Sequence, residues 1–236
     1  MQTNFDQKLL DGMRVDPNYD EPILNQVIRI AIYDEFHAYE TYAKVIESFG
    51  EVAPFSNILL SEQRHFMALT NIASKYDVPL PINNWADKIT IPSSLLECCE
   101  VGVAAEIDNI AMYDDLIQYA TEYPDLLDVL FRLQAASYNN HLPAFRSCVL
   151  KYSNQFIDNE TIYNDFSEHK IEDTISKINQ FSELAQKIRV GEVSQDEIMQ
   201  LLGNTNISFI AGAILGALGT TMFSKILDKN NEEQKS

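Results

Sequence analysis

Carboxylate and imidazole side chains that can bind transition metals recur along the N-terminal part of the chain, each on the apolar side of a segment with helical periodicity. Burying such a group is costly unless a partner compensates it. Four helices that each turn one of these groups inward can cage two metal ions inside a bundle. The sequence therefore predicts a metal site, and its candidate ligands are Glu35, Glu62, His65, Glu106 and His141.

The pair Glu62 and His65 stands one helical turn apart, so both side chains can reach one ion or span two neighbouring ions. A single pair of this kind is more often a surface glutamate beside a core histidine. The pair indicates a metal site only together with the other candidate ligands, because Glu35 and Glu106 lie on the inward stripes of two further helices. We therefore interpret the candidate side chains as parts of one site.

Two tyrosines stand at the same spacing from candidate glutamates on two different predicted helices. Tyr42 follows Glu35 by seven residues, and Tyr113 follows Glu106 by seven residues. An inward tyrosine at helical spacing is ordinary core, so we interpret both as packing groups or as hydrogen-bond partners of the ligating carboxylates.

Hydrophobic periodicity predicts an all-α protein built as an antiparallel four-helix bundle. Asp20 is expected to cap the first helix, and Ser93 or Ser94 the third. Pro143 should kink the fourth helix. The stretch 81–92 would be the long crossover between the helix pairs. The expected divisions are 1–20, an N-terminal extension; 21–152, the bundle; 153–205, a helical extension; 206–228, an apolar glycine-rich helix; and 229–236, a polar tail.

The segment from Ile207 to Phe223 contains no charged residue and is punctuated by glycines. Its length is at the short end of the roughly 17 to 25 residues that can cross a bilayer. Small residues at close spacing also let helices pack tightly against one another. The segment therefore has two interpretations, a C-terminal membrane anchor or a helix buried in a homo-oligomer.

The net charge is strongly negative, −18 from 17 Lys plus Arg and 35 Asp plus Glu. This charge repels nucleic acid and anionic lipid headgroups, so we expect no nucleic-acid partner. The first residues show neither the basic nor the apolar stretch of a secretory signal. The expected location is therefore the cytoplasm, with membrane association through residues 207–223 as the open alternative.

Two cysteines occupy related places on the third and fourth predicted helices. Cys99 lies seven residues before Glu106, and Cys148 lies seven residues after His141. On antiparallel helices their sulfurs would come to the same level. We favour two buried free thiols, because the cytoplasm is reducing, over a redox-linked pair.

The candidate ligands stand within four short segments of the predicted bundle. These are Glu35-Phe36-His37-Ala38 through Tyr42, Ser61-Glu62-Gln63-Arg64-His65, Val101-Gly102 through Glu106 with Ile110 and Ala111, and Asn140-His141-Leu142-Pro143-Ala144-Phe145. The pattern resembles the rubrerythrin and ferritin-like superfamily, and more closely a bacterial ferritin-like family. This resemblance implies a dinuclear iron site in which Glu35 and His65 serve one ion. His141 and a third-helix carboxylate would serve the other ion, while Glu62 and Glu106 bridge or flank the two.

Two positions depart from the pattern of that family. Tyr138 stands three residues before the fourth-helix histidine, where the pattern has a glutamate. Asn109 stands one turn after Glu106, where the pattern has a second acid. Fewer anionic ligands weaken a ferric state, and water or the oxygens of Tyr138 and Asn109 would have to complete two metal positions. One well-held metal therefore stays open as an alternative to two.

The resemblance implies an oxidoreductase that oxidises ferrous iron or removes oxygen or hydrogen peroxide, with iron as the metal and manganese or zinc as alternatives. The chain has no Cys-x-x-Cys pair for a rubredoxin-type iron centre, so an external donor or the substrate iron would supply the electrons. The alternative is a non-catalytic helical scaffold or assembly protein with a vestigial metal site. Such a protein would attach to a membrane or to an oligomer through its C-terminal helix.

Overall fold

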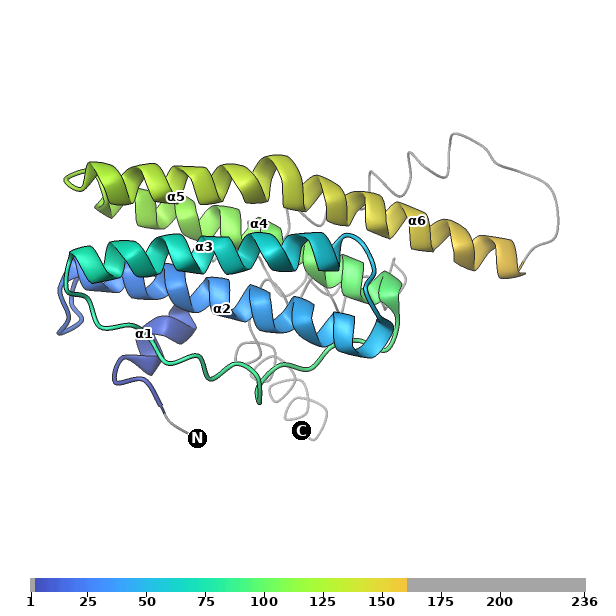
Figure 1. Ribbon diagram of the computed structural model, residues 1–236, viewed down its shortest axis with the longest axis horizontal. Coiled ribbons are helices and arrows are strands. Elements are labelled where there is room, and N and C mark those ends of the chain that lie inside the picture. Colours follow the sequence, from blue (N-terminus) through green and yellow to red (C-terminus); the bar gives the residue numbers. More distant parts are fainter. Residues whose placement is uncertain (1–2, 161–236) are drawn as a thin grey trace, which may run out of the picture. The chain divides into compact units, whose positions relative to one another are not determined.

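The computed structural model of the chain describes residues 3–160, and this part is all-helical (Figure 1). The predicted all-α fold is thereby confirmed. None of the helices between residues 3 and 160 combines the length and the apolar character of a membrane-spanning segment. The apolar helix predicted at 206–228, the polar tail at 229–236 and most of the predicted helical extension at 153–205 lie outside the described residues.

Four long stretches of helix correspond to the four predicted helices, and one short helix precedes them. The fourth stretch is interrupted by a π-helical turn just before Pro143. Proline lacks the N–H for an α-helical bond and its ring crowds the carbonyl four residues earlier, which favours a local change of helical pitch at this point. The elements are α1 Gln7–Gly12, α2 Ile23–Phe49, α3 Phe55–Lys75, α4 Leu95–Tyr119, α5 Pro124–Ala136, the π-helix η1 Ser137–His141, and α6 Leu142–Glu160.

Helices α2 and α4 begin in different ways. Helix α2 starts after Pro22, which makes no side-chain capping bond, so the predicted cap Asp20 lies outside the helix. At the start of α4, the Ser94 hydroxyl accepts a hydrogen bond from the Glu97 amide at 3.3 Å and donates one to the Glu97 carboxylate at 2.8 Å. Of the two serines considered from the sequence, Ser94 is therefore the cap.

The described chain divides into two compact units, and helix α4 contributes residues to both. The first unit comprises Met1–Ile91 and Asn109–His141. It contains α1, α2, α3, α5 and η1. The described part of the second unit consists of Pro92–Asp108 and residues 142–160, with the first half of α4 and the whole of α6.

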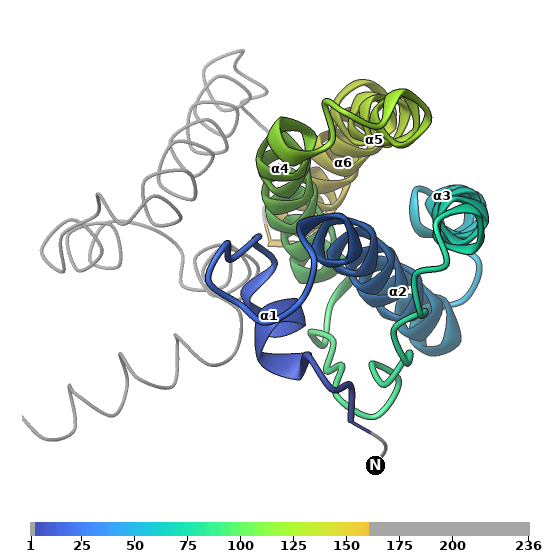
Figure 2. The ribbon, with the colours of Figure 1, turned by 90° about the vertical axis from the view of Figure 1, so that its left-hand side faces the viewer.

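Helix α2 is the centre of the first unit, and every residue from Gln26 to Glu35 is buried. Helices α1 and α3 both pack against it (Figure 2). Each fully buried aliphatic side chain contributes about 1.5–3 kcal/mol through removal of apolar surface from water. The apolar core of this unit includes Leu10, Ile28, Leu69, Tyr113 and Leu130.

A buried ion pair fastens the N-terminal stretch to α2. Asp6 Oδ1 lies 2.5 Å from Arg29 Nη2, and Asp6 Oδ2 accepts a hydrogen bond from Arg29 Nε at 2.6 Å. The guanidinium also donates to the carbonyl of Pro79 and lies 4.3 Å from the ring centroid of Phe5. Residues of the predicted N-terminal extension are therefore part of the first unit.

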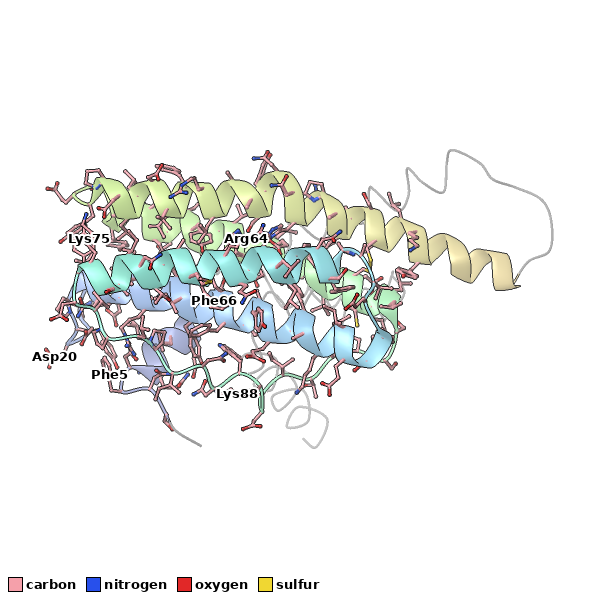
Figure 3. The ribbon with its side chains drawn as sticks, viewed as in Figure 1. Phe5, Asp20, Arg64, Phe66, Lys75 and Lys88 are labelled. Carbon is pink, nitrogen blue, oxygen red and sulfur yellow. A yellow bond between two sulfur atoms is a disulfide. The ribbon has the colours of Figure 1, made fainter. Side chains whose placement is uncertain are left out.

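Trp85 anchors the non-helical connection that follows α3. Its Nε1–H donates to the backbone oxygen of Tyr33 at 3.1 Å, and its ring lies 4.9 Å from the Tyr33 ring and 4.3 Å from the His37 ring. Lys88, on the same connection (Figure 3), donates to the Tyr33 hydroxyl at 2.9 Å. Burial lowers the pKa of His37 to about 4.

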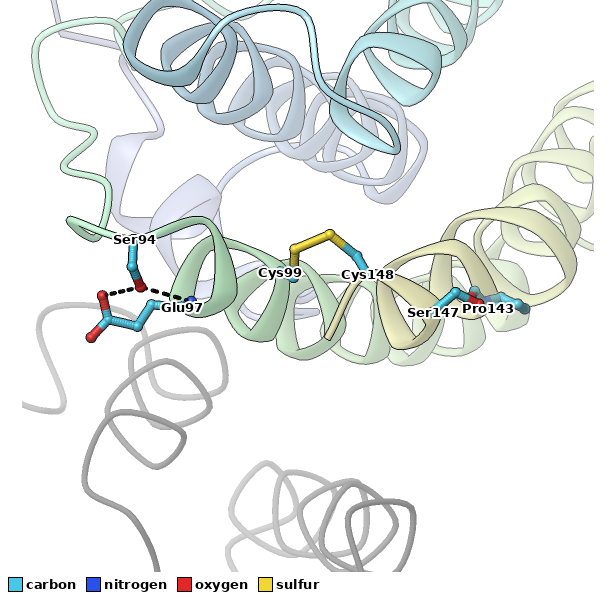
Figure 4. The surroundings of a disulfide bond; sticks show 6 residues. All are labelled: Ser94, Glu97, Cys99, Pro143, Ser147 and Cys148. Atoms are coloured by element: carbon cyan, nitrogen blue, oxygen red, sulfur yellow. Dashed lines mark hydrogen bonds between the residues drawn. A yellow bond between two sulfur atoms is a disulfide. The ribbon is translucent and has the colours of Figure 1, made fainter. Parts of the chain in front are cut away.

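In the second unit, helices α4 and α6 are joined by a disulfide between Cys99 and Cys148 (Figure 4). The helices also approach closely at Gly102, where a Cβ atom would stand 2.5 Å from Cε1 and 2.7 Å from Cγ of Phe145. Only glycine therefore leaves room for the Phe145 ring at this position.

Candidate metal centre

Helices α2 and α3 place two carboxylates and one imidazole together inside the first unit. Nδ1 of His65 lies 2.8 Å from Glu62 Oε2 and 3.2 Å from Glu35 Oε2. The three residues are buried, and one ligand atom of each lies within 4.8 Å of the others. Glu62 and His65 meet because they stand one turn apart on α3, and Glu35 reaches them from the buried face of α2.

The second histidine, His141, approaches the same glutamate from the last position of η1. Its Nδ1 lies 3.1 Å from Glu62 Oε1, so the two oxygens of Glu62 each face one imidazole. The rings of His65 and His141 stack with centroids 5.4 Å apart and planes inclined by 22°. Glu62 therefore lies between two nearly parallel imidazoles.

Burial and mutual interaction redistribute protons within this cluster. Burial, with the neighbouring charge of Glu62, raises the pKa of Glu35 well above its ordinary value. Burial acts against the charged form of Glu62, but hydrogen bonds with His141 and His65 outweigh it and lower the Glu62 pKa to about 2. Burial likewise acts against the charged form of His65, but the bonds with the two glutamates raise its pKa to about 10. The cluster thus holds protons that a bound cation could replace.

The donor atoms fit a transition metal. They are two carboxylates and two imidazole nitrogens on the same side of their rings, and all belong to buried side chains. Mixed carboxylate and imidazole sets bind iron, manganese and zinc, whereas calcium and magnesium prefer oxygen alone.

Tyr113 orients Glu35 from helix α4. Its hydroxyl donates a short hydrogen bond to Glu35 Oε1, and the tyrosine is fully buried. Burial and the charge of Glu35 raise the pKa of Tyr113 well above its usual range, so the phenol keeps its proton. The other predicted tyrosine, Tyr42, is buried and packs edge-on against Phe55, with ring centroids 6.0 Å apart.

Asn109 belongs to a hydrogen-bonded chain that reaches η1. Its Nδ2 donates to Asp34 Oδ2 at 2.6 Å, and its Oδ1 accepts a bond from the Ser137 hydroxyl at 2.7 Å. Ser137 is the first residue of η1, and His141 is the last. These hydrogen bonds therefore hold in place the π-helical turn that ends at His141.

The structure corrects the predicted place of Tyr138 beside the ligands, because this side chain is 63% exposed. The prediction assumed an α-helix, in which the residue three before His141 faces the same way. In a π-helix the backbone bonds span five residues, so each turn is wider. The inward position one turn before His141 falls instead to Ser137, which is buried.

The remaining predicted residues lie in the second unit. Glu106 is a buried residue of α4, and its approach to the other ligands stays a prediction from its helical spacing. Cys99 and Cys148 are both buried, with their sulfurs 2.01 Å apart in a disulfide. The structure thus differs from the favoured expectation of two free thiols, and the free cysteine among the described residues is Cys98.

No family model and no curated protein matches the chain. Among solved structures, the chain is similar to a hypothetical protein from Methanococcus jannaschii DSM 2661, with a TM-score of 0.50 and 21% sequence identity. The match covers 69% of this chain and 97% of the other. At this identity the likeness concerns the fold alone.

Two residues of the site have no counterpart among the sequence-based candidates. Ser61 Oγ lies 3.1 Å from Nε2 of His65 and 3.1 Å from Nε2 of His141. Asp34 is buried and accepts the hydrogen bond from Asn109. Ser61 stands one turn before His65 and within the segment Ser61-Glu62-Gln63-Arg64-His65, but the sequence pattern assigns no role to it.

Proposed function

We propose that this protein is a ferritin-like metal-binding protein whose four long helical stretches form a four-helix bundle around a carboxylate and histidine site. The observation that carries the proposal is the buried convergence of Glu35, Glu62 and His65, with His141 on the far oxygen of Glu62. Groups of this kind are rarely buried together unless they serve a site.

Two metal positions share Glu62 in this proposal. Glu35 and His65 would hold one divalent ion, His141 would hold the other, and Glu62 would contribute one oxygen to each. Glu106 is the proposed fifth ligand, from its spacing on α4. Iron is the metal we propose, with manganese and zinc as alternatives. Binding of a single ion is the alternative to two ions, and it would need fewer carboxylates to balance the positive charge of the metal.

The activity we propose is oxidation of ferrous iron or removal of oxygen or hydrogen peroxide. A ferrous pair, when bound, would supply electrons to the oxidant. The residues of the chain would exclude bulk water, and Tyr113 would keep one oxygen of Glu35 engaged. The raised pKa of Glu35 makes this carboxyl a place where a proton can be held.

A second candidate function is a non-catalytic scaffold with a vestigial metal site. It is favoured by the surroundings of two positions where the ferritin-like pattern has acids. Tyr138 is exposed, and Asn109 is engaged with Asp34 and Ser137. A site with two fewer carboxylates would bind divalent ions more weakly and would stabilise ferric ions less.

Metal content per chain tests the proposal. The purified protein, after incubation with ferrous, manganous or zinc ions and gel filtration, should retain metal, and the double variant Glu62→Ala with His65→Ala should lose it. The matched control is Gln63→Ala with Arg64→Ala, two exposed residues of the same helix, which should bind as the wild type does. Equal metal content in all three proteins would end the metal-site proposal.

Activity then separates the two functions. A catalytic protein loaded with ferrous ion should consume oxygen or peroxide faster than free ferrous ion does, whereas a scaffold that binds metal should not. We also propose that the protein is located in the cytoplasm and has no nucleic-acid partner. Residues 207–223 would form either a contact between copies of the chain in a homo-oligomer or a contact with a membrane. Fractionation of cells into soluble and membrane pools distinguishes the last two.

A further inference from the structure

One hydroxyl lies between the two histidines on the side away from the carboxylates. Ser61 Oγ is 3.1 Å from Nε2 of His65 and 3.1 Å from Nε2 of His141. The serine comes from α3, and the second histidine comes from η1, 80 positions later in the chain. A single side chain therefore contacts both imidazoles at the same ring atom.

The opposite edges of the two rings face the carboxylates. Nδ1 of His65 lies beside Glu62 and Glu35, and Nδ1 of His141 lies beside Glu62. Because both Nδ1 atoms lie beside Glu62 and both Nε2 atoms lie beside Ser61, the two imidazoles turn the same edge toward the carboxylates, and their planes differ by 22°. The cluster is thus layered, with carboxylates on the Nδ1 side and the serine on the Nε2 side.

This layering determines which nitrogen of each histidine can bind a metal. A metal takes the lone pair of an unprotonated ring nitrogen, so the other nitrogen must carry the proton and needs an acceptor. A serine oxygen has two acceptor positions. It can therefore accept one N–H from each ring, which leaves both Nδ1 atoms unprotonated on the side of the carboxylates.

We propose that Ser61 is a positioning residue shared by both metal positions: its oxygen accepts Nε2–H of His65 and of His141 and so directs both Nδ1 atoms at Glu62. This inference rests on the proposed metal-binding function and deepens it. Its distinctive consequence is that one substitution, at a residue that binds no metal itself, alters two ligands from separate helical elements at once.

The test compares side chains of equal shape with and without the hydroxyl. Ser61→Thr keeps the hydroxyl and adds a methyl group, Ser61→Val has the shape of threonine but a methyl group in place of the hydroxyl, and Ser61→Ala removes the hydroxyl in a residue that favours helix. The control is Ser56→Ala, a half-buried serine of the same helix. Far-UV circular dichroism establishes that each variant keeps its helices.

Zinc is the probe, because it is diamagnetic and binds carboxylate and imidazole together. Zinc affinity is measured by competition with a chromophoric chelator, and the protonated ring nitrogen of each histidine is identified from long-range nitrogen–proton NMR correlations. We expect Ser61→Ala and Ser61→Val to bind zinc about 10–100-fold more weakly, the range typical for loss of a group that orients a ligand. Ser61→Thr should recover most of the affinity.

The NMR spectra separate positioning from mere packing. In the zinc-bound wild type, His65 and His141 should both carry the proton on Nε2, and loss of the hydroxyl should change the signals of both rings. Wild-type affinity and unchanged ring signals in Ser61→Val would overturn this inference while leaving the proposed function intact. Failure of the wild type to bind zinc, manganese or ferrous ion would overturn both.

Discussion

The hydroxyl of Tyr113 on α4 donates a hydrogen bond to Oε1 of Glu35 on α2, and both side chains are buried. The bond occupies one oxygen of the carboxylate and leaves the other, Oε2, 3.2 Å from Nδ1 of His65. Tyr113 thereby sets which oxygen of Glu35 is available at the candidate metal site.

Replacement of Tyr113 by phenylalanine should destabilise the protein. Tyr113→Phe keeps the ring but leaves Glu35 Oε1 without its donor in a dry interior, which costs about 1–3 kcal/mol. Urea unfolding followed by circular dichroism measures the change. The control is Tyr39→Phe, whose half-buried ring packs edge-on against Phe66 with centroids 5.7 Å apart. Equal unfolding midpoints for the two variants would contradict the prediction.

Removal of one partner of the buried ion pair between Asp6 and Arg29 should destabilise the protein, because it leaves the other charge buried without compensation. Asp6→Ala leaves the guanidinium of Arg29, which is 1% exposed, without its carboxylate, and loss of one partner of a buried pair costs about 3–5 kcal/mol. The matched control is Asp128→Ala, which breaks an exposed pair with Arg132 at 2.9 Å. The control should change stability by about 1 kcal/mol or less.

Unfolding midpoints of the two alanine variants in urea decide the matter. If Asp6→Ala unfolds at the same urea concentration as Asp128→Ala, the N-terminal stretch does not fasten the first unit in the way described.

The pairing of Cys99 with Cys148 gives a prediction about thiol content. In urea without reductant, the protein should react with one equivalent of a thiol reagent, at Cys98, and after reduction with three. Because the bond spans 49 positions, it should stabilise the chain by about 4 kcal/mol through restriction of the unfolded state. Cys98→Ser is the control and should keep the bond, and three reactive thiols before reduction would contradict the pairing.

The candidate site shows what helical period can predict. Glu35, Glu62 and His65 lie on long uninterrupted helices, where a residue's face follows directly from its position in the sequence. Their convergence therefore could be anticipated from spacing. Helical period also predicts that Cys99 and Cys148 lie at the same height along neighbouring helices. It cannot tell whether the two residues are free thiols or form a disulfide.

Other features have no periodic trace in the sequence. The π-helical turn changes the inward position from Tyr138 to Ser137, and it is visible only when backbone hydrogen bonds are known. Helix α1 has six residues, too few to repeat an apolar pattern. The role of Ser61 depends on a histidine 80 positions away, so it arises from packing alone.

A buried carboxyl outside the candidate site, that of Glu100, should make the stability of the protein depend on pH. Glu100 on α4 is 6% exposed, and its Oε2 has no hydrogen-bond partner among the described residues. Burial, with the charge of Glu97, raises the pKa of Glu100 to about 8, compared with 4.5 for the ordinary group. The folded protein therefore holds this proton more tightly than the unfolded chain does.

Stability should then decrease as pH rises from about 4.5 through 8, by at most about 1.4 kcal/mol per pH unit, because the unfolded chain releases the proton first. Glu100→Gln keeps the shape of the side chain without its charge and should remove the part of this slope that comes from Glu100, while Glu35, whose pKa is also raised, keeps its own part. The variant should unfold at a higher urea concentration than the wild type above pH 8 and at a similar one below pH 5. The exposed substitution Glu47→Gln should follow the wild type at every pH. Parallel stability profiles for wild type and Glu100→Gln would show that Glu100 is charged in the folded protein.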